Sequence, residues 1–338
     1  MNDFTIIDHQ RVEPLGPDAL DKRRSQLRLH DLRAGAPLYR LDAELATAIN
    51  VALSVGAPLL LTGEPGTGKT QLAYYLTWYF GIEADRPQPE REQPFTLPVK
   101  STTLWKDLLY TFDTVQYFYD AQRKSRKDEE LDPKAYREKG PLWRAIEAAE
   151  GGRTAVVLID EIDKAPRDFP NDLLRELDQF EIRCKETREE LSGPKDRLPI
   201  VVITSNSEKR LPPAFLRRCI FHHIEFDEAL VRRAVAAWRS ASDDGGTGEG
   251  GGNVGPELRP GAAPELRPVD EAAVQAFMRV RRVPRLHKLP ATAELLVWMS
   301  ALDSRGVEAS ELTGAAGELP LLSALIKDRD DLKTLRAT

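Results

Sequence analysis

A phosphate-binding loop is predicted by eight consecutive residues, Gly63-Glu64-Pro65-Gly66-Thr67-Gly68-Lys69-Thr70. Glycines let backbone N–H groups turn inward around phosphate oxygens, and a helix that starts at the loop adds the positive end of its dipole. Lys69 is placed to reach the β- and γ-phosphates, and the Thr70 hydroxyl to bind Mg²⁺. The alternative is a glycine turn that only joins a strand to a helix, but all four fixed positions of the motif are present. We therefore expect residues 63–70 to bind a nucleoside triphosphate.

Two adjacent acids farther along the chain have the side chains that phosphate hydrolysis requires. Asp160 and Glu161 end an apolar run that starts at residue 154, and open parallel sheets bind ligands at such strand ends. Asp160 fits the Mg²⁺-coordinating acid of a Walker B motif, and Glu161 is positioned to polarise the attacking water. Two acids that only cap a helix are the alternative, which the phosphate-binding loop disfavours. Asp163 and Lys164 are expected to form local ion pairs.

A third candidate, Asn206, ends the next apolar run, which starts at residue 199. Asparagine at the end of a strand is most often a turn former. Because it follows the acid pair in chain order, we expect its amide to hydrogen-bond the attacking water and the γ-phosphate instead. His222 and His223 alternate across a predicted strand, so they face opposite sides and cannot share one metal ion.

The elements that must position these side chains alternate between strands and helices. Strands are predicted at residues 58–62, 94–100, 154–160, 199–204 and 219–226. Helices are predicted at residues 39–55, 71–80, 107–122, 141–149 and 170–180. This alternation indicates an α/β fold with a mostly parallel five-stranded sheet flanked by helices. The charged segment 123–140 is predicted to be an exposed loop.

Composition limits the classes of protein that fit. The 338 residues suggest about two domains, and 41% hydrophobic content is enough to build a core. The net charge of −6 argues against bulk attraction to nucleic acid or to an anionic membrane. The two cysteines, Cys184 and Cys219, form neither a disulfide framework nor a paired metal motif. Without a membrane-spanning run or a secretion signal in the sequence, we expect a cytoplasmic protein.

Three regions are predicted along the chain: a polar N-terminal arm at 1–36, an α/β nucleotide-binding domain at 37–226 and a small all-helical lid at 227–338. The lid is interrupted at 241–268 by a Gly- and Pro-rich stretch with a repeated Pro-Glu-Leu-Arg-Pro, which indicates a flexible linker. The helices of the lid are predicted at residues 227–240, 270–282, 291–302 and 319–335.

Taken together, the motifs resemble those of an AAA+ ATPase, and within that superfamily of the MoxR-like family. The resemblance covers roughly residues 37–305 apart from the linker. It depends on the phosphate-binding loop, on residues 156–165 and on Thr204-Ser205-Asn206. More telling are Asp168-Phe169-Pro170-Asn171-Asp172-Leu173-Leu174 and Leu211-Pro212-Pro213-Ala214-Phe215-Leu216-Arg217-Arg218.

The resemblance implies a P-loop AAA+ core with a helical lid, in which ATP and Mg²⁺ bind and ATP is hydrolysed. It gives Asn206 the sensor 1 role. It gives Arg218, with Arg217 as the close alternative, the role of an arginine finger that reaches a neighbouring subunit's ATP site. The implied assembly is a ring, expected to be a hexamer, that remodels or activates a client protein. Family members often act beside a partner that carries a von Willebrand factor A domain.

Two further expectations come from the resemblance. Residues 114–143 and 180–198 match insertions that this clade places around its pore, where they would contact a client that the sequence does not identify. A sensor 2 arginine is absent from the lid segment 289–294, so either Lys288 or Arg285 takes its role or the role is missing.

The basic run at 279–288 fits the C-terminus of a helix, whose dipole cations complement, better than a nucleic-acid-binding patch.

Two other functions use the same site. The first is a nucleotide-dependent switch or scaffold within a multi-protein defence or signalling assembly. The second is a nucleic-acid-linked NTPase, which the negative net charge and the lack of an Asn-Lys-x-Asp guanine-reading motif disfavour.

Overall fold

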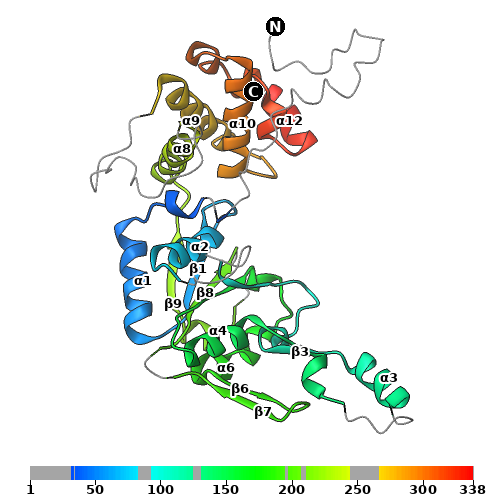
Figure 1. Ribbon diagram of the computed structural model, residues 1–338. Helices are drawn as coiled ribbons and strands as arrows, with labels where there is room; N and C mark the ends of the chain where they lie inside the picture. The colour runs from blue at the N-terminus through cyan, green and yellow to red at the C-terminus, as the bar shows by residue number, and fades with distance from the viewer. Residues whose placement is uncertain are drawn as a thin grey trace. The chain divides into compact units, whose positions relative to one another are not determined.

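The computed structural model describes residues 32–33, 35–82, 93–124, 131–194, 197–206, 211–243 and 266–337. Most of the predicted N-terminal arm and residues 244–265 of the predicted linker lie outside the described residues. The chain divides into two compact units (Figure 1). The sheet unit comprises Leu41–Glu64 and Gly68–Ile224. The helical unit comprises Glu225–Thr338 with Pro65–Thr67 and the described residues before Leu41.

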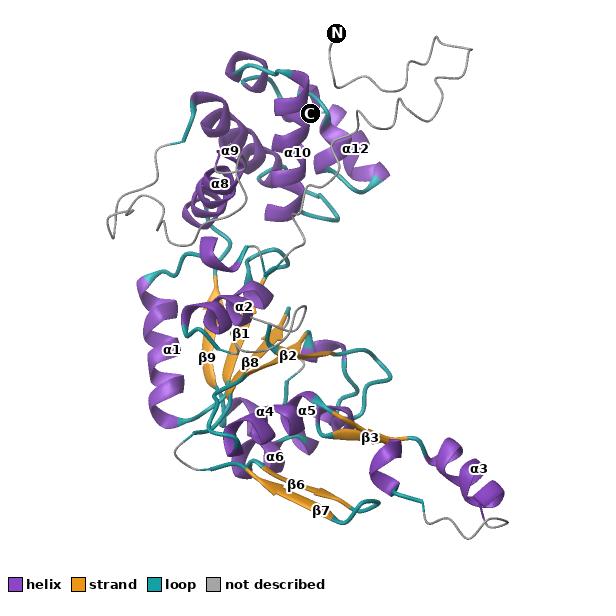
Figure 2. Cartoon of the chain, in the orientation of Figure 1, coloured by secondary structure: helices purple, strands orange, loops and turns teal. Residues whose placement is uncertain are grey.

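A five-stranded sheet forms the centre of the sheet unit (Figure 2). Its strands, in spatial order, are β2 (Phe95–Pro98), β5 (Val156–Asp160), β8 (Ile200–Ser205), β1 (Leu59–Gly63) and β9 (Ile220–Ile224). Every neighbouring pair is parallel, which confirms the predicted five-stranded parallel sheet. The three central strands, β5, β8 and β1, are the ones that carry the chemistry-bearing residues at their carboxyl ends.

Burial on both faces explains the near-continuous apolar sequence of the central strands. Leu60, Leu158 and Ile203 are fully buried, at 0% exposure. Against the sheet pack α1 (Ala43–Val55), α2 (Lys69–Tyr79) and α4 (Pro141–Glu150). Helix α1 begins four residues later than predicted, because the Asp42 side chain accepts a hydrogen bond from the Leu45 N–H and so caps the helix there.

The predicted helix at 107–122 is correct only from Thr114 onward. A 3₁₀ turn (η3, Trp105–Leu108) and a short strand (β3, Tyr110–Phe112) precede α3 (Thr114–Lys124). The predicted loop at 123–140 contains a second 3₁₀ turn (η4, Pro133–Tyr136) and β4 (Arg137–Lys139), which pairs antiparallel with β3. The two strands are three residues each and pair across some 27 residues of chain, so neither shows a recognisable alternation in the sequence. For this reason they were not predicted.

The predicted helix at 170–180 is divided at Leu173 into α5 (Phe169–Asp172) and α6 (Leu174–Gln179). Helix α6 ends at Phe180, whose φ of 49° is left-handed and turns the chain into the next element. That element is an antiparallel hairpin of β6 (Glu181–Cys184) and β7 (Glu189–Ser192), within the predicted insertion at 180–198.

The helical unit is built on α8 (Glu228–Asp243), α9 (Pro268–Arg281) and α10 (Thr292–Arg305). Its core is formed by fully buried side chains such as Phe277 and Trp298, and the Trp298 indole N–H donates to the Pro320 carbonyl at 2.8 Å. The predicted helix at 319–335 is wrong, because the segment forms two helices, α11 (Leu322–Leu325) and α12 (Arg329–Arg336).

Short 3₁₀ turns complete the helical unit: η2 (Ala36–Leu38), η7 (Ala309–Leu312) and η8 (Ala316–Glu318). A one-turn helix, α7 (Pro213–Leu216), precedes β9 in the sheet unit. Among the described residues, no helix has the length and apolar character needed to cross a membrane.

An ionic network joins the three main helices of the helical unit. Asp270 on α9 is 1% exposed, and its two carboxylate oxygens accept hydrogen bonds from Arg239 Nε on α8 at 3.0 and 3.1 Å. Arg267, just before α9, donates to the same carboxylate at 2.8 Å. Arg239 also pairs with Asp303 on α10. A buried carboxylate is stable only when it is paired in this way.

Candidate active site

The phosphate-binding loop follows β1 and ends where α2 begins, at Lys69. Gly66 and Gly68 have φ angles of 82° and 87°, in the left-handed region that side chains other than glycine rarely adopt. The Lys69 ammonium folds back over the loop and donates to the carbonyl oxygens of Gly63 at 2.9 Å and Glu64 at 2.8 Å. The lysine therefore lies against the loop that its sequence motif predicts.

Lys69 is 7% exposed, and this burial lowers the pKa of its ammonium. Carboxylates near the loop partly offset the effect of burial: Asp163, Asp160, Glu161 and Glu64. A cation with so little solvent around it interacts strongly with any anion that enters the loop.

The Asp160 carboxylate is the point where three elements meet. Its Oδ1 atom accepts a hydrogen bond from the Thr70 hydroxyl at 2.8 Å and another from the Thr204 hydroxyl at 2.7 Å. Asp160 ends β5, Thr204 lies on the neighbouring β8, and Thr70 lies in the first turn of α2. A hydroxyl and a carboxylate facing each other are hard oxygen ligands of the kind that Mg²⁺ prefers, so these residues fit that ion.

Glu161 has a left-handed backbone, with φ 60° and ψ 50°, which is uncommon for a residue other than glycine. Its N–H donates to the Thr204 hydroxyl at 2.8 Å, so one threonine contacts both acids. Its carboxylate accepts a hydrogen bond from Lys164 at the end of the 3₁₀ turn η5 (Ile162–Lys164). Both side chains border a hollow of about 530 Å³ that residues 98–101 also line.

Asn206 follows β8 and is exposed. Its backbone N–H donates to Asp163 Oδ1 at 3.0 Å, and the Ser205 hydroxyl donates to the same oxygen at 3.2 Å. Asp163 therefore holds the end of β8 beside the end of β5, where Glu161 lies. Among the described residues Asp163 forms no ion pair, whereas Lys164 forms the expected one, with Glu161.

The two candidate arginine fingers lie after α7, away from this network of bonds. Arg218 donates to Asp178 Oδ2 at 2.8 Å and to the Ala214 carbonyl at 3.3 Å. Among the residues that the structure describes, no hydrogen bond or ion pair joins Arg217 or Arg218 to the phosphate-binding loop, Asp160 or Glu161.

Sequence reasoning assigned no site role to Thr204 and only a local ion pair to Asp163, yet the structure places both at the centre of the hydrogen-bond network. Thr204 contacts both acids, and Asp163 binds the end of β8. Threonine is common in strands, and an acid two residues after an Asp-Glu pair has many uses. The only available signal was the parallel pairing of β5 with β8, which brings the two strand ends together.

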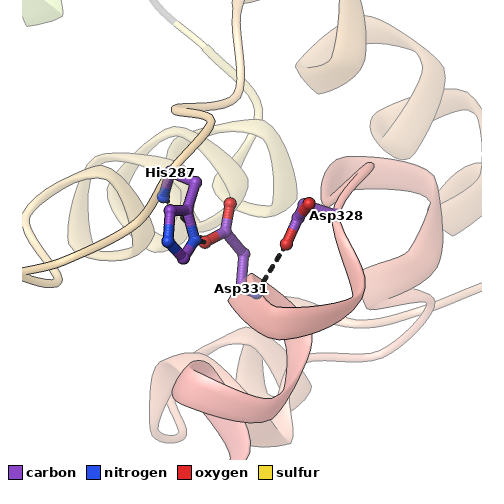
Figure 3. A group of neighbouring side chains, drawn as sticks. All are labelled: His287, Asp328 and Asp331. Carbon is purple, nitrogen blue, oxygen red and sulfur yellow. Dashed lines mark hydrogen bonds and ion pairs between the residues drawn. The ribbon is translucent and has the colours of Figure 1, made fainter.

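A second group of titratable side chains lies in the helical unit: His287, Asp328 and Asp331 (Figure 3). Asp331 is fully buried and accepts bonds from the backbone N–H groups of His287 at 2.7 Å and Lys288 at 2.9 Å, with His287 Nδ1 at 3.0 Å. Asp328 accepts from two backbone N–H groups at the start of α12. The carboxylates are thus satisfied by N–H donors, which fits a structural contact between the 287–288 segment and α12.

Of the two residues predicted as substitutes for a sensor 2 arginine, Lys288 is held through its backbone by Asp331, and Arg285 has a φ of 69°. The role of either stays a prediction. His223 on β9 contacts the Thr62 hydroxyl through Nδ1 at 3.0 Å.

Comparison with known proteins gives one family match, to the AAA domain (dynein-related subfamily), over residues 58–219. No curated protein matches the chain.

Two solved structures are similar at low identity. NtrX from Brucella abortus in complex with ADP is 15% identical over 90% of this chain and 62% of its own, with a TM-score of 0.45. The closed-state reconstruction of Hsp104 with ATPγS and FITC casein is 17% identical over 64% of this chain and 41% of its own, with a TM-score of 0.37. The chain thus spans less than two thirds of the length of either.

The matched residues contain the phosphate-binding loop, the acid pair and four of the five strands of the parallel sheet; β9 begins one residue after the match ends. Residues 58–219 are thus similar to the AAA domain, and the parallel five-stranded sheet flanked by helices is the fold expected of a P-loop AAA+ core.

Proposed function

We propose that this chain hydrolyses ATP to ADP and phosphate. The observation that carries the proposal is the convergence of the Thr70 and Thr204 hydroxyls on one oxygen of Asp160, with Glu161 next in the chain. This arrangement places a metal-binding pair beside a candidate base at the end of the phosphate-binding loop. A structural strand end has no need of three hydroxyl and carboxyl groups pointing at one another.

In the proposed reaction, backbone N–H groups of residues 63–70 bind the phosphates, and Lys69 exchanges its two carbonyl partners for phosphate oxygens. Thr70 and Asp160 hold Mg²⁺, which supplies neutralisation of charge on the β- and γ-phosphates when bound. Glu161 polarises the attacking water, and Asn206 hydrogen-bonds the water or the γ-phosphate.

We further propose that the active form is an oligomeric ring, a hexamer, of the MoxR-like type. Support comes from the two arginines after α7, which are exposed and make no bond to their own phosphate-binding loop among the described residues. A guanidinium that is not used in its own subunit is available to a neighbour's ATP site, and supplying it across an interface makes hydrolysis depend on assembly.

A client surface on the two insertions is part of the same proposal. The insertions are joined to each other, because Lys134 and Arg137 in the first both pair with Glu189 in the second, Lys134 at 3.2 Å. Helix α3 leaves three large apolar side chains exposed at helical spacing: Val115 at 82%, Phe118 at 60% and Tyr119 at 57%. An exposed apolar stripe of this kind is typical of a protein-binding surface. A partner with a von Willebrand factor A domain is proposed from the resemblance alone.

The test is the mass of Glu161→Gln protein measured by light scattering with and without ATP and Mg²⁺. The variant should bind ATP without hydrolysing it and should shift from monomer to roughly six subunits. The matched control adds Lys69→Ala, which should abolish nucleotide binding and with it the shift. A Glu161→Gln protein that still hydrolyses ATP would contradict the catalytic assignment, and a monomer in every condition would contradict the ring.

A nucleotide-dependent switch is the second candidate, and the hydrogen bond between Lys164 and Glu161 favours it. A carboxylate that is already bonded to an ammonium is a weaker base toward water, so ATP hydrolysis is slow. A slow ATPase can act as a timer. Turnover by the wild-type ring separates the two functions: sustained hydrolysis supports the remodelling motor, whereas a single slow turnover, with a partner bound only in the ATP form, supports the switch.

A further inference from the structure

The two adjacent arginines after α7 have different surroundings. The Arg218 guanidinium makes two directed bonds, from Nε to Asp178 Oδ2 at 2.8 Å and from Nη1 to the Ala214 carbonyl at 3.3 Å. Arg217 is exposed, and its side chain has no hydrogen bond or ion pair with any other residue that the structure describes. Sequence alone left the choice between them open with Arg218 first, but their contacts differ in kind.

The local backbone explains why the two side chains separate. Arg217 has helical angles, φ −66° and ψ −16°, and its N–H donates to the Pro213 carbonyl at 3.2 Å. Arg218 donates in the same way to the Phe215 carbonyl at 3.0 Å. Successive side chains leave a helical turn about 100° apart. When Arg218 points toward α6, Arg217 must therefore point elsewhere.

Asp178 pairs with Arg218 at the surface of the sheet unit, where both side chains are 45% exposed. It lies one residue before the end of α6, and the next turn is anchored by Phe180, which is 2% exposed. Burial and, secondarily, the charge of Asp178 raise the pKa of the nearby Cys219 thiol to about 12. The Asp178 carboxylate thus affects two neighbouring residues of the 217–219 turn: it accepts a hydrogen bond from Arg218, and its negative charge disfavours the thiolate of Cys219.

We infer that Asp178 is a positioning residue that retains Arg218 within its own subunit, and that Arg217 is the guanidinium supplied to the neighbouring subunit's ATP site. The inference rests on the proposed ring ATPase. A finger must leave its surroundings to reach a phosphate, and Arg217 has no bond among the described residues to break, whereas Arg218 would leave Asp178 without its cation. Asp178 also neutralises Arg218, so the turn presents the single positive charge of Arg217.

The first experiment compares hydrolysis by Arg217→Ala and Arg218→Ala at protein concentrations where wild type is assembled. Arg217→Ala should reduce kcat by about 10³ or more, the loss typical of a missing finger. Arg218→Ala should lose less than about tenfold, because in this assignment it acts only through the shape of the turn. Both variants should still bind ATP. The reverse order of losses, equal losses or no loss in either variant would each overturn the assignment.

The second experiment tests that the finger acts between subunits. Glu161→Gln protomers bind ATP and assemble without hydrolysing it and keep Arg217, while Arg217→Ala protomers have an intact ATP site. Mixed at equal amounts, the two inactive variants should regain hydrolysis, since about a quarter of the interfaces in a random ring pair an intact site with an intact finger. No recovery in mixed rings whose assembly is verified by light scattering would overturn a finger supplied in trans.

The third experiment tests Asp178 directly. In the Arg217→Ala background, adding Asp178→Asn should raise kcat at least tenfold over Arg217→Ala alone, because the released Arg218 can then reach the neighbouring site. Asp172→Asn in the same background is the matched control, since Asp172 is an exposed acid on the preceding helix and should restore nothing. A purely structural role for Asp178 predicts a further loss instead, which would overturn the inference.

Failure of this inference is distinguishable from failure of the proposed function. If wild type does not hydrolyse ATP, or if Glu161→Gln hydrolyses it normally, the ATPase proposal itself is wrong. If Glu161→Gln is inactive while the arginine variants behave in the reverse order, only the assignment of Arg217 and Asp178 is wrong.

Discussion

Lys164 donates a hydrogen bond to the carboxylate of Glu161, the residue proposed to polarise the attacking water. The two lie three residues apart across the η5 turn, and the left-handed backbone of Glu161 brings its side chain within reach of the lysine. The hydrogen bond raises the pKa of Lys164, with burial opposing it. The candidate base therefore has a cation as its partner, and that partner competes with the water for the carboxylate.

Replacing Lys164 by Ala should raise kcat about two- to fivefold and leave KM for ATP unchanged, because an exposed ion pair is a weak competitor. Steady-state hydrolysis at saturating ATP measures the change. Lys100→Ala is the matched control, since Lys100 lines the same hollow but forms no hydrogen bond to Glu161 among the described residues. A fall in kcat for Lys164→Ala, rescued by Lys164→Arg, would show that the lysine supports the base instead of restraining it.

Replacing Thr204 by Val should reduce kcat by about tenfold with little change in ATP binding. The substitution preserves shape but removes the hydroxyl that donates to Asp160 and accepts from the Glu161 N–H, so both acids lose a contact that fixes their geometry. Thr77→Val is the control, because Thr77 is equally buried but its hydroxyl bonds, among the residues that the structure describes, only to the Ala73 carbonyl in its own helix. Equal losses of kcat in the two variants would show that the Thr204 hydroxyl has no specific effect on the two acids and that Thr204 contributes only to packing.

The parts of the site that sequence predicted are those that local pattern encodes. The apolar run before Asp160 is short and rich in Val and Ile, which favours a strand buried on both faces, and the glycine spacing before Lys69 is that of a phosphate-binding loop. The structure has β5 and the loop at these positions. Thr204 and Asp163 were missed as site residues because their roles depend on which strands are neighbours. The part of the helix predicted at 107–122 that precedes Thr114 failed for the same reason, since β3 exists only through its pairing with β4.

Cys219 should react slowly with alkylating reagents although it is only half-buried. Burial first, and then the charge of Asp178, raise its pKa to about 12, so at pH 8 the thiolate fraction is on the order of 10⁻⁴. In a Cys184→Ala background, iodoacetamide labelling followed by mass spectrometry should be at least about 100-fold slower for folded than for denatured protein. Comparable labelling rates at pH 8 would contradict this.

Asp331→Asn should loosen the helical unit. The Asp331 carboxylate is fully buried and accepts the N–H groups of His287 and Lys288, and an amide nitrogen in place of one oxygen faces a donor, which costs roughly 2 kcal/mol of local stability. Hydrogen exchange of peptides from residues 266–337 measures the loss. Asp330→Asn is the control, because Asp330 is exposed and pairs only with Lys333 among the described residues, so its exchange should change far less.

The effect of Asp331→Asn should also depend on pH. Burial opposes ionisation of Asp331, but the bonds from His287 and Lys288 prevail and lower its pKa below the ordinary value. A carboxyl with a lowered pKa in the folded state stabilises the protein above its unfolded pKa, about 3.9, and loses that contribution as pH falls through the folded value. The difference in exchange between wild type and Asp331→Asn should therefore be full at pH 6–7 and shrink below about pH 4. A chelator that reproduced the loss in wild type would show instead that a metal ion, and not the N–H donors, holds His287, Asp328 and Asp331 together.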